Sequence, residues 1–268
     1  MGDVMLGRGV AAALSGDWAA AFAPVTTVLR EVDLAFANLE SPLTTAPQTA
    51  SGYDLRASPE AAVALGGAGF DVVSLANNHA WDAGEMGLLE TEAALTAAGV
   101  AGVRADAAHC QGGVCVLALD ESESAVDVAA AAAQVSAAAA ADDLVIVSIH
   151  WGGEFQAQPS PRQAHLARTL VAAGADLVIG HGPHVLQRIE WVNGAPVAYS
   201  LGNFLFDQAY PADSRQGAIL RVTACGERVS AVEAIPTIVE DGHVRPAGPD
   251  EAWDILQRLT YEEHRRED

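Results

Sequence analysis

The sequence predicts an α/β protein with a β-sheet at its core. Apolar runs of strand length alternate with alanine-rich stretches of helix length along most of the chain, and this alternation is typical of strands joined by helices. Towards the C-terminus, strand-like runs follow one another without helices, which predicts antiparallel or mixed pairing there. The 268 residues suffice for one large globular domain or two small ones.

The predicted strands lie at residues 34–37, 71–75, 114–119, 144–149, 177–179, 195–200, 218–223 and 229–235. The predicted helices lie at residues 17–32, 59–66, 84–98, 125–141, 161–173 and 251–265. Ser58 and Ser160 each precede a proline, which is the arrangement of a helix N-cap followed by a first-turn proline. No repeat or linker divides the chain, so we expect a single domain over residues 1–268.

The composition excludes two classes of protein. The chain carries 35 acidic and 14 basic residues, all of the latter arginine, for a formal net charge of −21. Such a chain repels phosphate backbones, and no basic stripe offsets this charge, so we expect no nucleic-acid binding. No stretch reaches the roughly 18 apolar residues that a transmembrane helix needs. The N-terminus lacks the regions of a signal peptide, so the cellular location stays unknown.

The three cysteines are too few for a disulfide framework and lack the spacing of a zinc site. Cys110 and Cys115 flank Gln111-Gly112-Gly113, a predicted tight turn, so a local disulfide is one interpretation. Two unlinked small residues near a turn are the simpler interpretation, and we favour it.

Polar side chains of the kinds that bind metals repeatedly follow the predicted strands. Asn38 and Glu40 follow one such run, and His150 directly follows another. In an open α/β sheet the carboxyl ends of the strands converge on one edge, where ligands bind. We therefore expect a single site that contains Asp3, Glu40, Asn78, His79, His150 and His184.

This set of donors suits a pair of divalent cations. Carboxylate and amide oxygens with imidazole nitrogens are ligands for manganese, iron or zinc, whereas a site for a softer ion uses cysteine. Two ions about 3.5–4 Å apart can hold a water molecule, lower its pKa and neutralise a phosphoryl transition state. The identity of the metal is not indicated.

Each of these residues, taken alone, has a simpler interpretation. Asp3 alone would be a solvated carboxylate near the terminus, Asn38 a turn residue, and His150 a hydrogen-bonded core histidine. The run over residues 77–79 is harder to explain in this way, because burying it is costly unless its polar groups are paired. Donor residues follow five predicted strands, and this combination favours a site over coincidence.

Six motifs make the chain resemble a known family. They are GDVMLGR (2–8), ANLESP (37–42), SLANNHAWDAG (74–84), HWGGEF (150–155), GHGPHVL (180–186) and YSLGNF (199–204). With these motifs in this order, the chain resembles the CapA family of capsule and poly-γ-glutamate synthesis proteins, within the calcineurin-like metallophosphatase superfamily. The resemblance implies a metallophosphatase-like sandwich of mixed β-sheets flanked by helices.

The resemblance also implies a role for each matching residue. The implied metal ligands are Asp3, Asn38, Glu40, Asn78, His150, His181 and His184. His79 would donate a proton to the leaving group, and Asp82 would hold its imidazole in one tautomer. Glu154 and Asn203 would not bind metal themselves but would contact and orient the ligands. The implied cofactor is a divalent metal, with two ions expected.

The chain departs from the superfamily pattern at three places. Met5 stands where many members carry a histidine two residues after the first aspartate. Gly182 occupies one of the two positions that usually hold the late histidines, so either His181 substitutes or the site holds one metal weakly. Only Met1 precedes the first motif, where the family has an apolar strand, so we expect a truncated strand and Asp3 on a frayed terminus.

Two functions fit these residues. The first is a metal-dependent hydrolase with phosphoesterase-like chemistry, linked to capsule or poly-γ-glutamate synthesis, and the His79–Asp82 pair favours it. The second is a non-catalytic metal-binding component of a capsule or cell-envelope polymer assembly, which Met5 and Gly182 favour modestly. A sugar- or peptide-binding groove lined by aromatic residues near the motifs has less support, because core packing explains these residues equally well.

The expected partners follow from the resemblance. They are an anionic polymer or a small phosphoester as substrate, and membrane-bound capsule or poly-γ-glutamate synthase components. An envelope location is implied if an anchor lies upstream. The net charge of −21 opposes binding of a free polyanion unless the metals or Arg8, Arg56 and Arg162 screen the repulsion.

Overall fold

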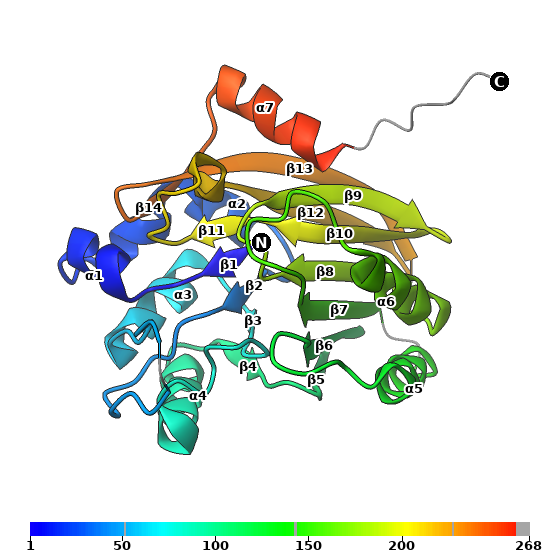
Figure 1. The fold of residues 1–268 in the computed structure, drawn as a ribbon, viewed down its shortest axis with the longest axis horizontal. Helices are drawn as coiled ribbons and strands as arrows, with labels where there is room; N and C mark the ends of the chain where they lie inside the picture. Colours follow the sequence, from blue (N-terminus) through cyan, green and yellow to red (C-terminus); the bar gives the residue numbers. More distant parts are fainter. Residues whose placement is uncertain (51, 142–143, 227, 261–268) are drawn as a thin grey trace.

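The computed structural model describes residues 1–50, 52–141, 144–226 and 228–260. Two β-sheets face each other, and helices cover the outer face of each (Figure 1). This is the α/β sandwich of mixed sheets flanked by helices that the sequence predicts, and it agrees with a metallophosphatase-like fold.

The first sheet has five parallel strands in the order β11 (Asn203–Leu205), β1 (Asp3–Val4), β2 (Phe36–Leu39), β3 (Val72–Ser74) and β4 (Ala101–Val103). Strand β1 lies inside this sheet. Its Asp3 is the register partner of Asn38 on one side and of Asn203 on the other. Three polar residues of the resemblance therefore lie side by side in neighbouring strands.

The second sheet has the order β5 (Ala107–Gln111), β6 (Val114–Asp120), β7 (Leu144–His150), β8 (Leu177–His181), β10 (Ala195–Leu201) and β9 (Leu186–Val192). Its inner strands are parallel, and both edge strands pair antiparallel. A third, antiparallel sheet contains β12 (Gln216–Cys225), β13 (Arg228–Glu240) and β14 (His243–Pro246). The prediction of mixed and antiparallel pairing near the C-terminus is thus confirmed.

Helices α1 (Arg8–Leu14), α2 (Thr26–Arg30), α3 (Ala62–Ala68) and α4 (Gly84–Ala97) lie on the side of the first sheet, and α5 (Val128–Ala139) and α6 (Pro161–Ala172) on that of the second (Figure 1). Helix α7 (Pro249–Leu259) packs near β9 and β13. The expected cap of α6 is present, because Ser160 Oγ accepts a hydrogen bond from Gln163 N at 3.2 Å. Among the described residues, no helix is both long and apolar enough to cross a bilayer.

Three groups of buried apolar side chains hold the layers together. The group between the sheets contains Phe36 and Val72 from the first sheet and Ile146 and Ile179 from the second. The other two groups fill the space between each sheet and its helices. Because strands of both sheets are fixed against this shared core, their carboxyl ends are held at one edge of the sandwich.

The predicted boundaries differ from the structure where the sequence signal is short or broken. Residues 17–32 are not one helix. A 3₁₀ segment, η1 (Trp18–Val25), contains Pro24, and an α-helix begins only at Thr26, because proline removes one backbone donor and clashes with the preceding turn. Helix α1 and the strands β1, β4, β5, β9, β11 and β14 were not predicted. Residues 261–265 of the last predicted helix lie outside the described residues.

The favoured interpretation of two unlinked cysteines is wrong. Cys110 and Cys115 form a disulfide. They are register partners on the β5–β6 hairpin, so the antiparallel pairing brings their side chains together. Cys225 is free and exposed.

The Phe204 ring links β11 to the helical layer and provides a test of this packing. It is fully buried, with its centroid 6.0 Å from that of Phe22 and 6.2 Å from that of Phe70. Replacing Phe204 by alanine should lower the free energy of unfolding by about 3–5 kcal/mol, measured by denaturant titration. Trp253, which is 67% exposed on α7, is the control. An equal loss in Trp253→Ala would contradict the assignment of Phe204 to the core.

Candidate metal centre

The carboxyl ends of strands from both large sheets meet at one edge of the sandwich. Asp3 lies in β1, Glu40 directly follows β2, and Asn78 and His79 follow β3. From the second sheet, His150 ends β7, His181 ends β8, and His184 lies on the turn that follows. Asn203 begins β11 and faces this turn.

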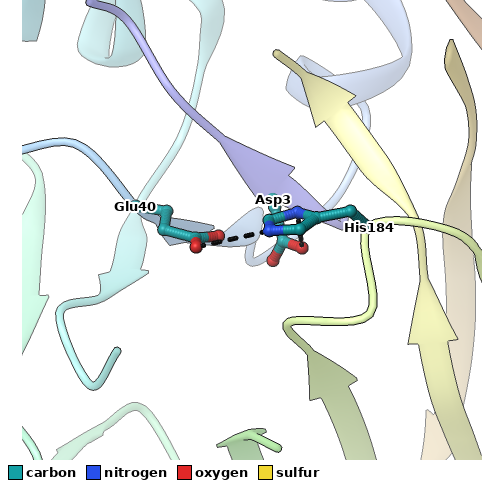
Figure 2. Close-up of side chains that lie close together, drawn as sticks. All are labelled: Asp3, Glu40 and His184. Carbon is teal, nitrogen blue, oxygen red and sulfur yellow. Dashed lines mark ion pairs between the residues drawn. The ribbon is translucent and has the colours of Figure 1, made fainter. Parts of the chain in front are cut away.

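Asp3, Glu40 and His184 form the centre of this site. One ligand atom from each lies within 4.8 Å of the others, and all three residues are buried. His184 Nδ1 is 3.3 Å from Asp3 Oδ2, and His184 Nε2 is 3.6 Å from Glu40 Oε1. Figure 2 shows the imidazole of His184 close to both carboxylates, with a dashed line marking an ion pair to each. A cluster of this composition could hold a divalent metal ion.

The prediction of Asp3 on a frayed terminus is wrong. Asp3 is fully buried and belongs to a strand paired on both sides. The Met1 ammonium group donates a hydrogen bond to Phe36 O at 2.7 Å and is itself buried. The start of the strand is therefore fixed by backbone pairing and by this bond.

Two further histidines approach the carboxylates. His181 Nδ1 lies 3.1 Å from Asp3 Oδ1, and His150 Nε2 lies 4.0 Å from Glu40 Oε1. Three buried polar atoms nearby have no hydrogen-bond partner among the described residues: Asn78 Oδ1, His150 Nδ1 and His181 Nε2. Unpaired polar atoms are costly to bury, so the donor set fits a metal-bound state better than a purely structural one.

The protonation of the centre reflects burial and mutual charge. Burial raises the pKa of Glu40 well above its usual range, although the charge of His184 opposes this and Asp3 adds to it. Burial would also raise the pKa of Asp3, but hydrogen bonds from His181 and His184 hold it well below its usual range. Burial would lower the pKa of His184, but the charge of Glu40 and the bond to Asp3 raise it to about 10.

The other two histidines are held neutral. Burial lowers the pKa of His150 to about 3, against the opposing charge of Asp3. Burial also lowers the pKa of His181, again opposed by Asp3. Neutral imidazole is the form that binds metals, so both rings are prepared for ligation at neutral pH.

An amide network that the sequence did not reveal positions the two carboxylates. Asn38 Nδ2 donates to Asp3 Oδ1 at 2.9 Å and to Glu40 Oε2 at 3.5 Å. Asn38 Oδ1 in turn accepts from Asn77 Nδ2 at 3.0 Å, and the same nitrogen donates to Leu39 O at 2.9 Å. Asn77 was noted only as a costly polar residue. Its buried bonds tie β2 to the loop after β3.

A second network fixes His184. Its Nδ1 lies 2.9 Å from Asn203 Oδ1, and Asn203 Nδ2 donates to Gln208 Oε1 and Ser214 O, both at 2.9 Å. This pattern makes Nδ1 the protonated nitrogen and leaves Nε2 available towards Glu40. His184 has a φ of +57°, a conformation that costs energy for a residue other than glycine and is typical of functional positions. Neither Gln208 nor Ser214 lies in a motif.

His79 and Asp82 lie at the entrance of the site. His79 Nδ1 is 2.8 Å from Asp82 Oδ2, and the side-chain exposures are 18% and 6%. Asn77 Oδ1 accepts from His79 N at 3.1 Å, so the network that holds the carboxylates also holds this residue. The loop before Leu55 holds the backbone of Asp82 in place, since Thr49 N donates to Asp82 O at 2.7 Å. No hydrogen bond to the Nε2 atom of His79 is found among the described residues.

Two departures from the superfamily pattern have physical reasons. Gly182 has a φ of +104°, and a Cβ there would lie 2.9 Å from His150 Nε2 and 3.0 Å from Trp151 O. The His150 ring thus occupies the space that a side chain at position 182 would need. Met5 is fully buried in the apolar core beside the helices, and its sulfur accepts a hydrogen bond from Gly7 N at 2.9 Å.

The remaining residues of the motifs differ in their exposure. Glu154 is exposed, and its charge, with that of Asp120, raises the pKa of Glu40 in addition to the larger effect of burial. Trp151 is buried and donates to Tyr199 O at 2.9 Å, so it belongs to the core and lines no groove. Trp81 and Phe155 are exposed.

The arginines expected to screen a polyanion are paired with carboxylates. Arg8 binds Asp207, Arg56 binds Asp54, and Arg162 binds Glu121. These three arginines therefore offer little unpaired positive charge that could screen a polyanion.

An apolar cavity of about 530 Å³ opens elsewhere, at the amino ends of the strands. Met1, Phe36, Val114, Leu144 and Leu177 are among its lining residues. It shares no residue with the metal centre.

The fold and the site together define an α/β sandwich of the metallophosphatase-like type with a buried cluster that could bind metal. Comparison with known sequences identifies the family. The pattern of the family described as "Bacterial capsule synthesis protein PGA_cap" matches residues 1–112 and 104–208, and the chain belongs to this family.

Individual relatives agree with this assignment. The chain is 29% identical over 291 residues to the "PGA biosynthesis protein CapA" of Bacillus subtilis (strain 168), covering 97% of this chain and 76% of the relative. It is 30% identical over 285 residues to the "Capsule biosynthesis protein CapA" of Bacillus anthracis, covering 92% and 68%. A "Probable polyglutamine synthesis accessory protein" of Mycobacterium tuberculosis is 29% identical over 233 residues, 71% of this chain and 60% of that protein.

Metal binding should release protons from the centre. The pKa of His184 is raised to about 10, so its ring carries a proton at neutral pH that an ion must displace. We expect the apparent affinity for manganese to rise about tenfold per pH unit for each proton displaced, between about pH 6 and pH 8. Calorimetry in buffers of different ionisation enthalpy measures the protons released. An affinity independent of pH would contradict the protonation described for His184.

Adding a methyl group at position 182 should disturb the centre. In Gly182→Ala the new Cβ meets His150 Nε2 and the backbone also becomes strained, so we expect a loss of about 1–3 kcal/mol in unfolding free energy and weaker metal binding. Gly194→Ala is a matched control, because Gly194 also has a positive φ of +91° but nothing lies within 4 Å of its Cβ position. Equal metal affinity in both variants would refute the described contact.

Proposed function

We propose that this protein is a metal-dependent hydrolase with phosphoesterase-like chemistry that serves capsule or poly-γ-glutamate synthesis. The observation that carries the proposal is the partly exposed His79–Asp82 pair at the entrance of a buried carboxylate–imidazole cluster. A proton donor beside a metal cluster has a purpose in bond cleavage and none in a purely structural site.

The donor set suits two divalent ions of manganese, iron or zinc. Asp3 and His184 would hold one ion together with Glu40, with His181 beside Asp3. Glu40 would also contribute to a second ion, with Asn78 and His150. Bound metal supplies an activated water nucleophile and neutralises charge on the phosphoryl group. The amide of Asn38 holds the two carboxylates in place rather than serving as a ligand, because its oxygen already accepts from Asn77.

The remaining steps belong to the chain's own groups. His79 would give a proton from Nε2 to the oxygen of the leaving group, while Asp82 accepts from Nδ1 and keeps the ring in the required orientation. Asn203 would keep the His184 proton on Nδ1. Since these residues extend from β1 to β11, the chain would act as one domain.

A second candidate is a non-catalytic metal-binding component of a capsule assembly. Met5 and Gly182 favour it, because each replaces an expected nitrogen ligand by a residue without one. In either case the partners would be other components of the polymer synthesis apparatus, as the names of the relatives suggest.

Hydrolysis of p-nitrophenyl phosphate and bis(p-nitrophenyl) phosphate with added manganese tests the proposal. We expect His79→Asn to lower kcat by about 10²–10⁴-fold with no change in metal content, because only proton transfer is lost. His165 is exposed on α6, and His165→Asn is the matched control that should keep full activity. Metal content is measured by elemental analysis.

The outcomes separate the two candidates. Turnover that His79→Asn abolishes, with metal retained, supports the hydrolase. Bound metal without turnover of either ester in the parent protein supports the non-catalytic component. If turnover is unaffected in His79→Asn, the assignment of His79 as the proton donor is wrong.

A further inference from the structure

The backbone around Arg8 is held in an unusual conformation. Arg8 has a φ of +45°, which costs energy for an arginine and indicates that its surroundings impose it. A Cβ on Gly7 would lie 2.5 Å from Leu55 O, and one on Gly9 would lie 2.9 Å from Asp207 Oδ2. The two glycines thus allow Leu55 and Asp207 to approach the chain closely on either side of Arg8.

The guanidinium of Arg8 is held in place, but not all of its N–H groups form hydrogen bonds within the described residues. Its Nε donates to Asp207 Oδ2 at 3.1 Å and its Nη2 donates to Asp207 Oδ1, so the carboxylate holds one edge of the fork. Its Cζ lies 5.6 Å from the ring centroid of Tyr53 and 5.8 Å from that of Phe206. Nη1 has no hydrogen-bond partner among the described residues, and 28% of the side chain is exposed.

This arginine is connected to the metal centre by a short run of chain. The Phe206 ring centroid lies 4.9 Å from that of His184 on one side and close to the Arg8 guanidinium on the other. Residues 203–208 therefore serve both groups. Asn203 and Phe206 contact His184, whereas Asp207 holds Arg8.

We propose that Arg8 binds one carboxylate or phosphate group of the substrate, at a fixed distance from the bond that is cleaved at the metal centre. This inference rests on the proposed function, because it takes the metal centre as the place of the reaction. Asp207 leaves the pair close to neutral, so Arg8 attracts no long polyanion. Its free N–H groups instead offer a directed contact for a single anionic group.

Two other arginines that pair with carboxylates do not have this arrangement. Arg56 uses Nε and Nη2 on Asp54 and Nη1 on Ala46 O. Arg104 forms a two-bond pair with Glu92 from Nε and Nη2, as Arg8 does with Asp207, but no aromatic ring is recorded against its guanidinium within the described chain. A role for Arg8 limited to tying α1 to the segment after β11 would require neither the Tyr53 ring nor the strained φ.

Unbranched α,ω-dicarboxylates of increasing length test the inference. Their binding to manganese-loaded protein is measured by calorimetry against monocarboxylates of the same length. One carboxylate can bind the metal while the other reaches Arg8, so we expect one length at which the dicarboxylate binds at least about tenfold more tightly. Arg8→Gln should abolish this length preference, whereas Arg104→Gln, the matched control, should keep it.

A second variant and a second series of ligands complete the test. Tyr53→Ala, at a side chain that is 76% exposed, should weaken the preference several-fold without affecting folding, so the test does not depend on the stability of the Arg8 variant. Replacing the distal carboxylate by a phosphonate shows which anion is bound more tightly. The inference is supported if either the dicarboxylates or the compounds with a distal phosphonate show a length preference that Arg8→Gln loses.

Failure has two distinguishable forms. If manganese binds but no length preference exists, or if Arg8→Gln retains it, the inference about Arg8 is overturned and the proposed function stands. If neither manganese, iron nor zinc binds, both are overturned.

Discussion

The structure depends on one buried carboxylate. Asp3 lies inside a parallel sheet with no access to water, and an isolated charge in that position would be very costly. Hydrogen bonds from Asn38, His181 and the amide of Gly182 compensate this cost. These partners come from β2, from the end of β8 and from the turn that follows it, so satisfying one carboxylate fixes the position of the first sheet relative to the second.

The remaining features of the site follow from this constraint. Once Asp3 is placed, His184 must approach it from the turn after β8, with a positive φ and with Asn203 behind it. Glu40 then faces His184, and its burial makes the cluster retain protons that a cation would replace. The site is therefore more than a set of ligands. It is an arrangement in which hydrogen bonds position Asp3, Glu40 and His184 relative to one another.

The sequence predicted the parts of this arrangement that repeat along the chain. Apolar runs ending in Asn38, Asn78 or His150 indicated both the strands and the edge at which they meet, and the motifs carried the resemblance to the family. It could not predict β1 as a stable strand, because two residues show no alternation and the stability comes from neighbours at positions 38 and 203. The roles of Asn77, Gln208 and Ser214 in the site could not be predicted for a similar reason. Their importance lies in hydrogen bonds across long sequence separations, for which local pattern gives no signal. The Cys110–Cys115 bond was undervalued because the turn between them was recognised but the strand pairing around it was not.

Because residues from both sheets form the site, the site can be completed only late in the synthesis of the chain. The three central residues of the candidate site are Asp3, Glu40 and His184, so the last of them is synthesised long after the first two. A ribosome-bound fragment that ends before β8 contains both carboxylates but lacks His181 and His184. An ion held by all three central residues would therefore be captured late in biogenesis, once both sheets can assemble.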